Sequence, residues 1–415
     1  MSDGVVDVSA PPADGGPLPA GTRLVHIGPH KTGTTAVQAA LFEVRAELAE
    51  LGIYYPSYDR HPMHAVLAVT GRHSMMGDDR PLDRHWKRLL GEVTAAGDQT
   101  AVISSEFFSE ADADGIARVV GDLGGERVHI VVTLRPLVKI LPSQWQQYVQ
   151  NGLRMGYENW LRHMLSKPPY EQPNPSFWRR HRHDRLIERW VDVVGPEKVT
   201  VVVVDDADRE MVLRVFESLL GLPDRMLPAV PIATNRSLSL GEIEMIRHFN
   251  IEFRSHDDLP DTLYSRLLRY GAVPQLKLGR TPRRDEPKVT TPRWAQDRAV
   301  EIGHEIADWV STSGVRVIGD LELLHQPLPA AGQETPHAPV VDPDAAAQAL
   351  FGAVAATPTL AGAAPAAPAL AATVASAKSE TDAAASPVRQ VRSTELVKIL
   401  AGRARRRLAR GFVHR

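Results

Sequence analysis

Cysteine and long apolar runs are missing from this chain of 415 residues, and each absence excludes a class of protein. There is no cysteine, so disulfide bonds, thiolate catalysis and cysteine-based zinc or iron–sulfur sites are excluded. No apolar run approaches the ~20 residues that a membrane-spanning helix requires. Lys and Arg total 48 against 50 Asp and Glu. This balance argues neither for nor against nucleic acid, and we predict no nucleic-acid partner.

The first 21 residues also lack a recognisable targeting signal. Residues 1–20 are polar and rich in Pro, Gly and Asp, without a basic region followed by an apolar core. A secretory signal peptide has both. We therefore expect residues 1–21 to be disordered and the protein to be cytoplasmic.

Five short apolar runs alternate with helical patterns between residues 22 and 328. The runs cover residues 24–27, 52–56, 100–105, 127–134 and 198–204, and the helical patterns cover 36–42, 86–96, 112–123, 142–152, 177–194 and 210–220. Strands that alternate with helices form βαβ units on a parallel sheet. The sequence therefore predicts one α/β domain over residues 22–328, with a central, mainly parallel sheet flanked by helices.

The composition changes after residue 328. Residues 329–387 are dominated by Ala and Pro, which favours a disordered linker. Residues 388–415 carry nine Lys and Arg against Glu395, with apolar residues among them. Such a basic amphipathic tail suits peripheral contact with an anionic membrane, here the inner membrane face. A solvated tail, or one that docks on the acidic remainder of the chain, explains the same pattern.

The stretch at residues 24–38 is the strongest local signal. An apolar strand runs into a loop containing Gly28 and Gly33, and a helix follows. This arrangement binds phosphate through backbone N–H groups and the helix dipole. The loop keeps the glycine spacing and the hydroxyl (Thr35) of a Walker A loop, but Thr34 stands where that loop has lysine. The loop's lysine is Lys31, two residues before the second glycine.

A second motif follows the apolar run at residues 127–134. Arg135 leaves the end of this predicted strand, and Ser143 comes eight residues later. Ligands of open α/β sheets bind beyond the carboxyl ends of the strands. A guanidinium and a hydroxyl at this edge suit a phosphate group. The alternative is that Arg135 only binds carbonyl groups at the end of its strand.

Taken together, these motifs resemble those of bacterial sulfotransferases that use 3′-phosphoadenosine-5′-phosphosulfate (PAPS) and sulfate carbohydrates or glycolipids. The matching segments are residues 29–35, 104–106, 135–147 and 235–239. The resemblance covers about residues 23–328 and implies a P-loop-like, three-layer fold. It also implies that PAPS is bound by Pro29, His30, Lys31, Thr32, Gly33, Thr34, Thr35, Arg135 and Ser143. The implied acceptor is a hydroxyl of a small molecule, glycolipid or polysaccharide.

Sulfuryl transfer requires a group that takes the acceptor's proton. We predict Glu106, which directly follows the run at 100–105. His64 is the second candidate, and a role for Glu106 as a helix cap or an ion-pair partner is the alternative. Lys31 would neutralise the leaving phosphate oxygen.

No metal is required for such a transfer. The histidine pairs His61/His64 and His181/His183 lack a third ligand in a recognisable motif, so we expect solvated histidines rather than a metal site.

Two other functions fit parts of the sequence. One is a P-loop kinase or NTPase, for which Asp205 and Asp206 would supply the magnesium ligand. The other is a nucleotide- or polyanion-binding protein without catalysis.

The basic segment 177–194 is interpreted as an amphipathic helix with Trp178, Leu186 and Trp190 inward. Acceptor contact through Arg179 or Arg182 is the alternative role for this segment.

Overall fold

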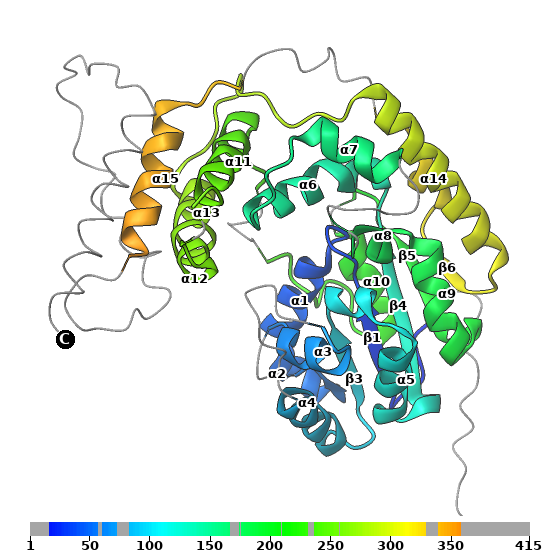
Figure 1. Cartoon of the computed structure of the whole chain (residues 1–415). Coiled ribbons are helices and arrows are strands. Elements are labelled where there is room, and N and C mark those ends of the chain that lie inside the picture. Colours follow the sequence, from blue (N-terminus) through cyan, green and yellow to red (C-terminus); the bar gives the residue numbers. More distant parts are fainter. Residues whose placement is uncertain are drawn as a thin grey trace, which may run out of the picture. The chain divides into compact units, whose positions relative to one another are not determined.

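Figure 1 shows the fold of the chain, a computed structural model. The structure describes residues 16–56, 60–72, 83–166, 174, 176–208, 210–230, 236–256, 258–328 and 339–357. These residues belong to one compact unit that ends at Thr357, and residues 358–415 form a second unit outside the described part. The predicted basic tail therefore lies outside the described residues, as do residues 1–15, and membrane contact stays a prediction.

Six strands form one parallel sheet in the order β2-β3-β1-β4-β5-β6. The strands are β1 (Arg23–Ile27), β2 (Ile53–Tyr54), β3 (Thr100–Ser104), β4 (Val128–Leu134), β5 (Val199–Val203) and β6 (Arg316–Ile318). Every residue of β1, β4 and β5 is buried, as expected for central strands of a parallel sheet covered on both faces. The predicted parallel α/β sheet is therefore confirmed, with β6 as a strand that the sequence patterns did not indicate.

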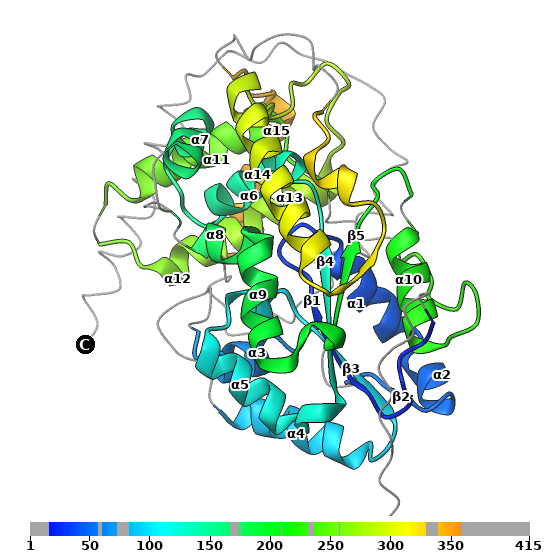
Figure 2. The same ribbon diagram turned by 90° about the vertical axis from the view of Figure 1, so that its right-hand side faces the viewer.

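Helices cover both faces of the sheet and make three layers (Figure 2). One face packs on α1 (Thr34–Glu43), α2 (Arg45–Glu50) and α10 (Met211–Leu220). The opposite core includes α3 (Met63–Val69), α4 (Arg84–Ala95), α5 (Ala113–Asp122), α8 (Ser176–His181) and α9 (His183–Val194). Alternation along β1 explains this, because Leu24 faces the first group whereas Val25 and Ile27 face the second. The P-loop-like, three-layer fold is thus confirmed.

The remaining helices extend the second core. They are α6 (Leu137–Gln150), α7 (Tyr157–Leu165), α11 (Leu240–Phe253), α12 (Asp261–Tyr264), the π-helical segment η5 (Ser265–Ala272), α13 (Val273–Gly279) and α14 (Arg293–Thr312). Short 3₁₀ turns lie at η1 (Glu106–Glu110), η2 (Gly125–Arg127), η3 (Pro196–Lys198) and η6 (Leu321–His325). Ser239 caps α11 in a reciprocal capping box with Glu242. Among the described residues, no helix is long and apolar enough to cross a membrane.

Two predicted element boundaries are wrong. The helix expected to begin at Pro142 begins at Leu137, with Pro142 inside it. The basic helix predicted over residues 177–194 is broken at Arg182 into α8 and α9. Its inward face is as predicted, because Trp178, Leu186 and Trp190 are buried.

Part of the predicted disordered linker 329–387 is helical, which corrects that prediction. Helix α15 (Pro343–Ala355) packs on η5 and α13. A Cβ on Gly352 would lie 2.5 Å from the Gly271 carbonyl oxygen, so the two backbones approach closely. The Gln275 amide nitrogen donates to Gln348 at 2.7 Å. The Ala-rich composition did not reveal this helix because its docking depends on small residues and a few polar contacts.

The N-terminal prediction is likewise wrong for residues just before β1. Leu18 is buried and its N–H donates to the Leu219 carbonyl at 2.8 Å. One apolar side chain in a polar segment gave no pattern from which this docking could be predicted.

Candidate active site

The loop between β1 and α1 has the geometry of an anion-binding site. Gly33 has φ 92° and directly precedes α1, and among the described residues no side chain caps this helix start. Gly28 is required because a Cβ there would lie 1.9 Å from the Thr34 hydroxyl, which donates to the Gly28 carbonyl. Gly33 and Thr35 are exposed. The first N–H groups of α1 therefore point their positive end at a position that a ligand can reach.

Buried hydrogen bonds fix this loop to the neighbouring strands. The Thr32 hydroxyl donates to the Pro29 carbonyl at 2.7 Å and lies 2.9 Å from the Thr133 hydroxyl on β4. His26 on β1 bridges Ser104 on β3 (Nδ1–Oγ 2.8 Å) and Thr133 (Nε2–Oγ1 3.3 Å). Burial lowers the pKa of His26 to about 3, so its ring is neutral.

Lys31 holds the most unusual backbone position in the loop. Its φ is 75°, a left-handed value that few non-glycine residues adopt. Its ammonium donates to the Gln147 Oε1 at 3.4 Å. Burial lowers the pKa of Lys31, nearby Glu106 opposes this and nearby Arg135 adds to it. The ends of β1 and β3 thus bring together Lys31 and Glu106, two of the predicted site residues, so that their charges interact.

Arg135 lies beside the loop, as expected if β1 and β4 are neighbours. Its Nη1 donates to the Lys31 carbonyl at 3.2 Å. Its Nε and Nη2 donate to Asp206 Oδ2 at 3.1 and 2.9 Å, and Lys139 Nζ reaches the same oxygen at 2.8 Å. Although burial opposes it, these bonds hold the pKa of Asp206 below its usual value. Arg135 therefore does more than bind carbonyls at its strand end.

Ser143 lies on α6, and its hydroxyl donates to the Ile140 carbonyl at 2.9 Å. The serine hydroxyl is partly exposed and rotates about one bond. It is therefore satisfied within its own helix, and among the described residues no hydrogen bond joins it to Arg135.

Glu106 begins η1 at the end of β3. Its Oε2 lies 3.2 Å from His61 Nε2 and accepts a 3.4 Å bond from Gln38. His61 also stacks on Phe107 at a centroid distance of 5.7 Å. Glu106 is partly exposed, so its carboxylate is both held in place and reachable. Ser105, not Glu106, caps η1.

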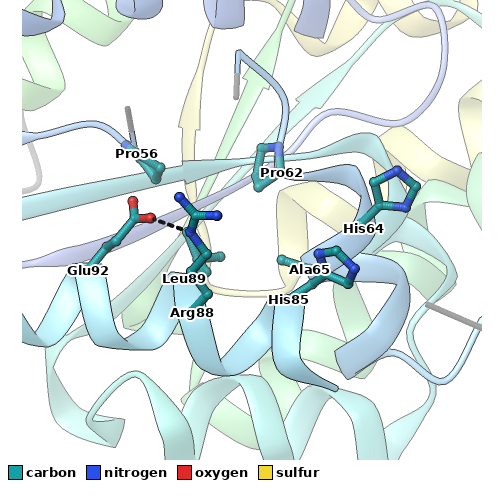
Figure 3. Close-up of a pocket in the computed structure, with 8 residues that line it drawn as sticks. All are labelled: Pro56, Pro62, His64, Ala65, His85, Arg88, Leu89 and Glu92. Carbon is teal, nitrogen blue, oxygen red and sulfur yellow. Dashed lines mark hydrogen bonds and ion pairs between the residues drawn. The ribbon is translucent and has the colours of Figure 1, made fainter. Parts of the chain in front are cut away.

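His64, the second candidate base, lies in a pocket that none of the other predicted site residues lines. It is exposed and packs beside His85 at 5.4 Å, in a pocket that also contains Arg88 and Glu92 of α4 (Figure 3). That pocket holds only about 20 Å³, the room of a single water. The histidine beside Glu106 is therefore His61 rather than His64.

Lys277, near the loop, carried no sequence signal. Burial, together with the charges of Lys31 and Arg236, lowers the pKa of Lys277 on α13 to about 8. Lys277 lies far along the chain from Lys31, so only folding brings the two together. Arg236 pairs with Glu242 at 2.9 Å, and Asn235, which precedes it, lies outside the described residues.

The remaining histidines are not solvated as expected. His181 and His183 are buried, and burial lowers the pKa of His183 to about 4 and that of His181 well below its usual value. Among the described residues, no group of three or more His, Asp or Glu side chains is placed to hold a metal ion.

Comparison with known proteins adds little to this geometry. No family model matches the sequence, and no curated protein matches it. Among solved structures, a sulfotransferase from Alicyclobacillus acidocaldarius aligns with 56% of this chain and 93% of its own. The identity is 18% and the TM-score 0.37. At these values the likeness carries no argument about function, which must come from the site itself.

The buried His26 makes a prediction about pH. Unfolded histidine titrates near pH ~6.5, whereas folded His26 has a pKa of about 3. Between these values only the unfolded chain binds the proton. The contribution of neutral His26 to the free energy of unfolding is therefore fully present above about pH 6.5. It is lost as the pH falls, by ~2 kcal/mol at pH 5.

Denaturant unfolding at pH 7 and pH 5 measures this loss. His26→Gln should reduce the pH-dependent loss by about 2 kcal/mol, whereas the exposed His64→Gln should leave it as in the wild type. An equal loss in wild type and His26→Gln would show that His26 is not the titrating group.

Proposed function

We propose that this protein is a PAPS-dependent sulfotransferase that moves a sulfuryl group to a hydroxyl of a carbohydrate or glycolipid. The observation that carries the proposal is the meeting of three strand ends at one sheet edge. β1 supplies the loop with Lys31, β3 supplies Glu106 and β4 supplies Arg135. A phosphate-binding helix start, two cations and one carboxylate base are the groups that this transfer needs.

The reaction would proceed by in-line displacement. The acceptor oxygen forms a bond to sulfur while the bond from sulfur to the 5′-phosphate oxygen breaks, and adenosine 3′,5′-bisphosphate leaves. Glu106 takes the proton of the acceptor hydroxyl. Lys31 and the first N–H groups of α1 stabilise the negative charge that develops on the leaving phosphate. By analogy with phosphoryl transfer, the protein contributes mainly positioning and charge stabilisation.

Arg135 is the proposed ligand of the 3′-phosphate, with Ser143 and Lys139 nearby on α6. The arginine fork is already oriented toward an anion, because it holds the carboxylate of Asp206 together with Lys139. A phosphate at the same place would keep the charge-assisted hydrogen bonds to both cations.

The kinase alternative is disfavoured by the same contact. Asp206, one of the two residues that would bind magnesium, already accepts from Arg135 and Lys139. Its neighbour Asp205 accepts from the Ala207 N–H at 2.8 Å and closes a turn. The positive charges of Arg135 and Lys139 beside Asp206 also disfavour the binding of a divalent cation there.

The proposal is tested by incubating the full chain with PAPS that carries labelled sulfur, in a cell extract that supplies acceptors. A labelled carbohydrate or glycolipid that depends on the protein supports the proposal. Binding of the cofactor without any labelled acceptor would favour a non-catalytic nucleotide-binding protein.

Lys31 should be the most sensitive position for turnover. Lys31→Ala should lower the turnover number by a factor on the order of 10² to 10³, as for the loss of one electrostatic stabiliser. Lys87→Ala, which removes an exposed lysine of α4, is the matched control and should keep wild-type turnover. Wild-type turnover in a folded Lys31→Ala protein would remove Lys31 from the mechanism.

Arg135 should recognise the 3′-phosphate specifically. Arg135→Ala should weaken the binding of adenosine 3′,5′-bisphosphate by roughly 2–5 kcal/mol, because the 3′-phosphate loses one partner of a charge pair. The affinity for adenosine 5′-phosphate, which lacks the 3′-phosphate, should change little. Isothermal titration measures both, and equal weakening of the two nucleotides would mean that Arg135 only shapes the loop through the Lys31 carbonyl.

Asp206 should compete with the 3′-phosphate for Arg135 and Lys139. Asp206→Asn removes the competing charge and should tighten adenosine 3′,5′-bisphosphate by about tenfold at low salt. Asp205→Asn, one residue earlier and outside this ion pair, should leave the affinity unchanged. Weaker binding by Asp206→Asn would instead mean that Asp206 orients Arg135 for the ligand.

A further inference from the structure

A cavity of about 310 Å³ lies next to the loop. Its walls come from the loop, from α3 and the turn after it, from η1, α6 and α8. The lining residues are His30, Leu67, Arg72, Phe107, Glu110, Gln144, Gln147, Tyr148, Asn151, Ser176 and Arg180. Its volume is at the lower end of the range for small-molecule sites, about 300–1,000 Å³.

The cavity borders the residues of the proposed reaction centre. His30 in its wall directly precedes Lys31, and Gln147 in its wall accepts from the Lys31 ammonium. Phe107 in its wall directly follows Glu106. A hydroxyl at this end of the cavity would therefore lie beside both the cation and the carboxylate that the transfer requires.

Two buried polar atoms in the cavity wall have no hydrogen-bond partner among the described residues. These are Gln144 Oε1 and Arg72 Nε. Gln144 is 1% exposed, so its carbonyl oxygen is removed from bulk water. A buried polar atom without a partner is costly, which makes such atoms in a cavity wall a sign of a missing ligand. Gln144 Oε1 requires a donor, whereas Arg72 Nε requires an acceptor.

The charges of the wall favour an anionic group on that ligand. Arg180 is buried and shares its guanidinium among Tyr148, Ser176 and Glu110. Arg72, by contrast, donates from Nη2 to the Glu110 carbonyl at 2.7 Å, which is a neutral group. The negative charge of Glu110 thus offsets the positive charge of Arg180, one of the two arginines in the wall.

His30 in the same wall does not add a positive charge. Burial, with nearby Arg180 and Lys31, lowers the pKa of His30 well below its usual value. Arg180 Nη1 lies 3.3 Å from His30 Nδ1, and because arginine only donates, that nitrogen must accept. His30 is therefore neutral, and the cavity keeps one excess positive charge at Arg72.

We propose that this cavity is the acceptor site and that it takes a hydroxyl-rich unit bearing one carboxylate, such as a uronic acid. The inference rests on the proposed function for the transfer itself. Gln144 accepts from a sugar hydroxyl, and Arg72 binds the carboxylate through Nε. The neighbouring Phe107 and Leu67 supply an apolar surface for the sugar ring face. An apolar phenol would leave Gln144 and Arg72 unpaired, so phenols and sterols are rejected.

The test compares methyl β-glucuronide with methyl β-glucoside, which differ only in the carboxylate. Binding to the full chain is measured by ligand-observed NMR, with and without adenosine 3′,5′-bisphosphate. The wild type should bind the glucuronide about ten- to hundredfold more tightly, the value of one charge-assisted hydrogen bond. Arg72→Gln should bring the ratio of the two affinities close to one. Arg84→Gln, at an exposed position of α4, should keep the wild-type ratio.

Gln144→Met tests the second contact and keeps the shape of the side chain. It should weaken both glycosides by about five- to tenfold and leave their ratio unchanged. Gln150→Met on the same helix, where the amide donates to the Gln146 carbonyl outside the cavity, is its control.

Equal affinity for the two glycosides in the wild type, or an unchanged ratio in Arg72→Gln, would overturn the proposed site. Tighter binding of 4-nitrophenol than of either glycoside would overturn it as well. The result also separates this proposal from the proposed function. Glucuronide binding without nucleotide binding would uphold the cavity and refute sulfuryl transfer from PAPS. Nucleotide binding without binding of either glycoside would refute the proposed acceptor site and leave the proposed transfer from PAPS standing.

Discussion

The buried hydrogen bonds among His26, Ser104, Thr133 and Thr32 are the interaction on which the site depends. They join the three central strands just where the chain leaves β1 for the loop. Because these four side chains are buried, water cannot easily replace their hydrogen bonds. Breaking one of these bonds leaves a buried polar atom without a partner. The loop is therefore held in one conformation, with Lys31 at a left-handed backbone angle and the start of α1 open. A site for an anion must be preorganised in this way if its charge is to be used in a reaction.

Positive charge gathers around this loop from distant parts of the chain. Lys31 comes from the loop, Arg135 from the end of β4, Lys139 from the start of α6, and Lys277 from α13. Asp206 and Glu106 offset only part of it. Like charges at short range destabilise a folded protein, so their concentration here requires a compensating function. A cofactor that carries several negative charges, and places them on separate groups, is such a function. The proposed PAPS site uses the cations around both the 5′ and 3′ ends of the nucleotide.

Local patterns of the sequence were enough to predict five of the six described strands, the loop, and the position of Arg135 beside the loop. Each depends on residues close in sequence, and the parallel pairing of β1 with β4 then brings Arg135 to Lys31. Residues whose role depends on distant segments were not predictable. Asp206 was considered only as a magnesium ligand, and Arg180 was passed over for Arg179 and Arg182. The structure instead ties Arg179 to the Glu110 carbonyl and Arg182 to Asp184. Helix α15 was missed because its docking depends on Gly271, more than seventy residues earlier in the chain.

We propose that the site binds a nucleotide with phosphates at both the 3′ and the 5′ positions, without a metal ion. Calorimetric titration of the full chain with adenosine 3′,5′-bisphosphate in a metal-chelating buffer tests it most directly. If the site is as proposed, binding is saturable and does not change when magnesium is added, and ATP with magnesium does not bind at the same concentrations. Magnesium-dependent binding of ATP, with no binding of adenosine 3′,5′-bisphosphate, would contradict it.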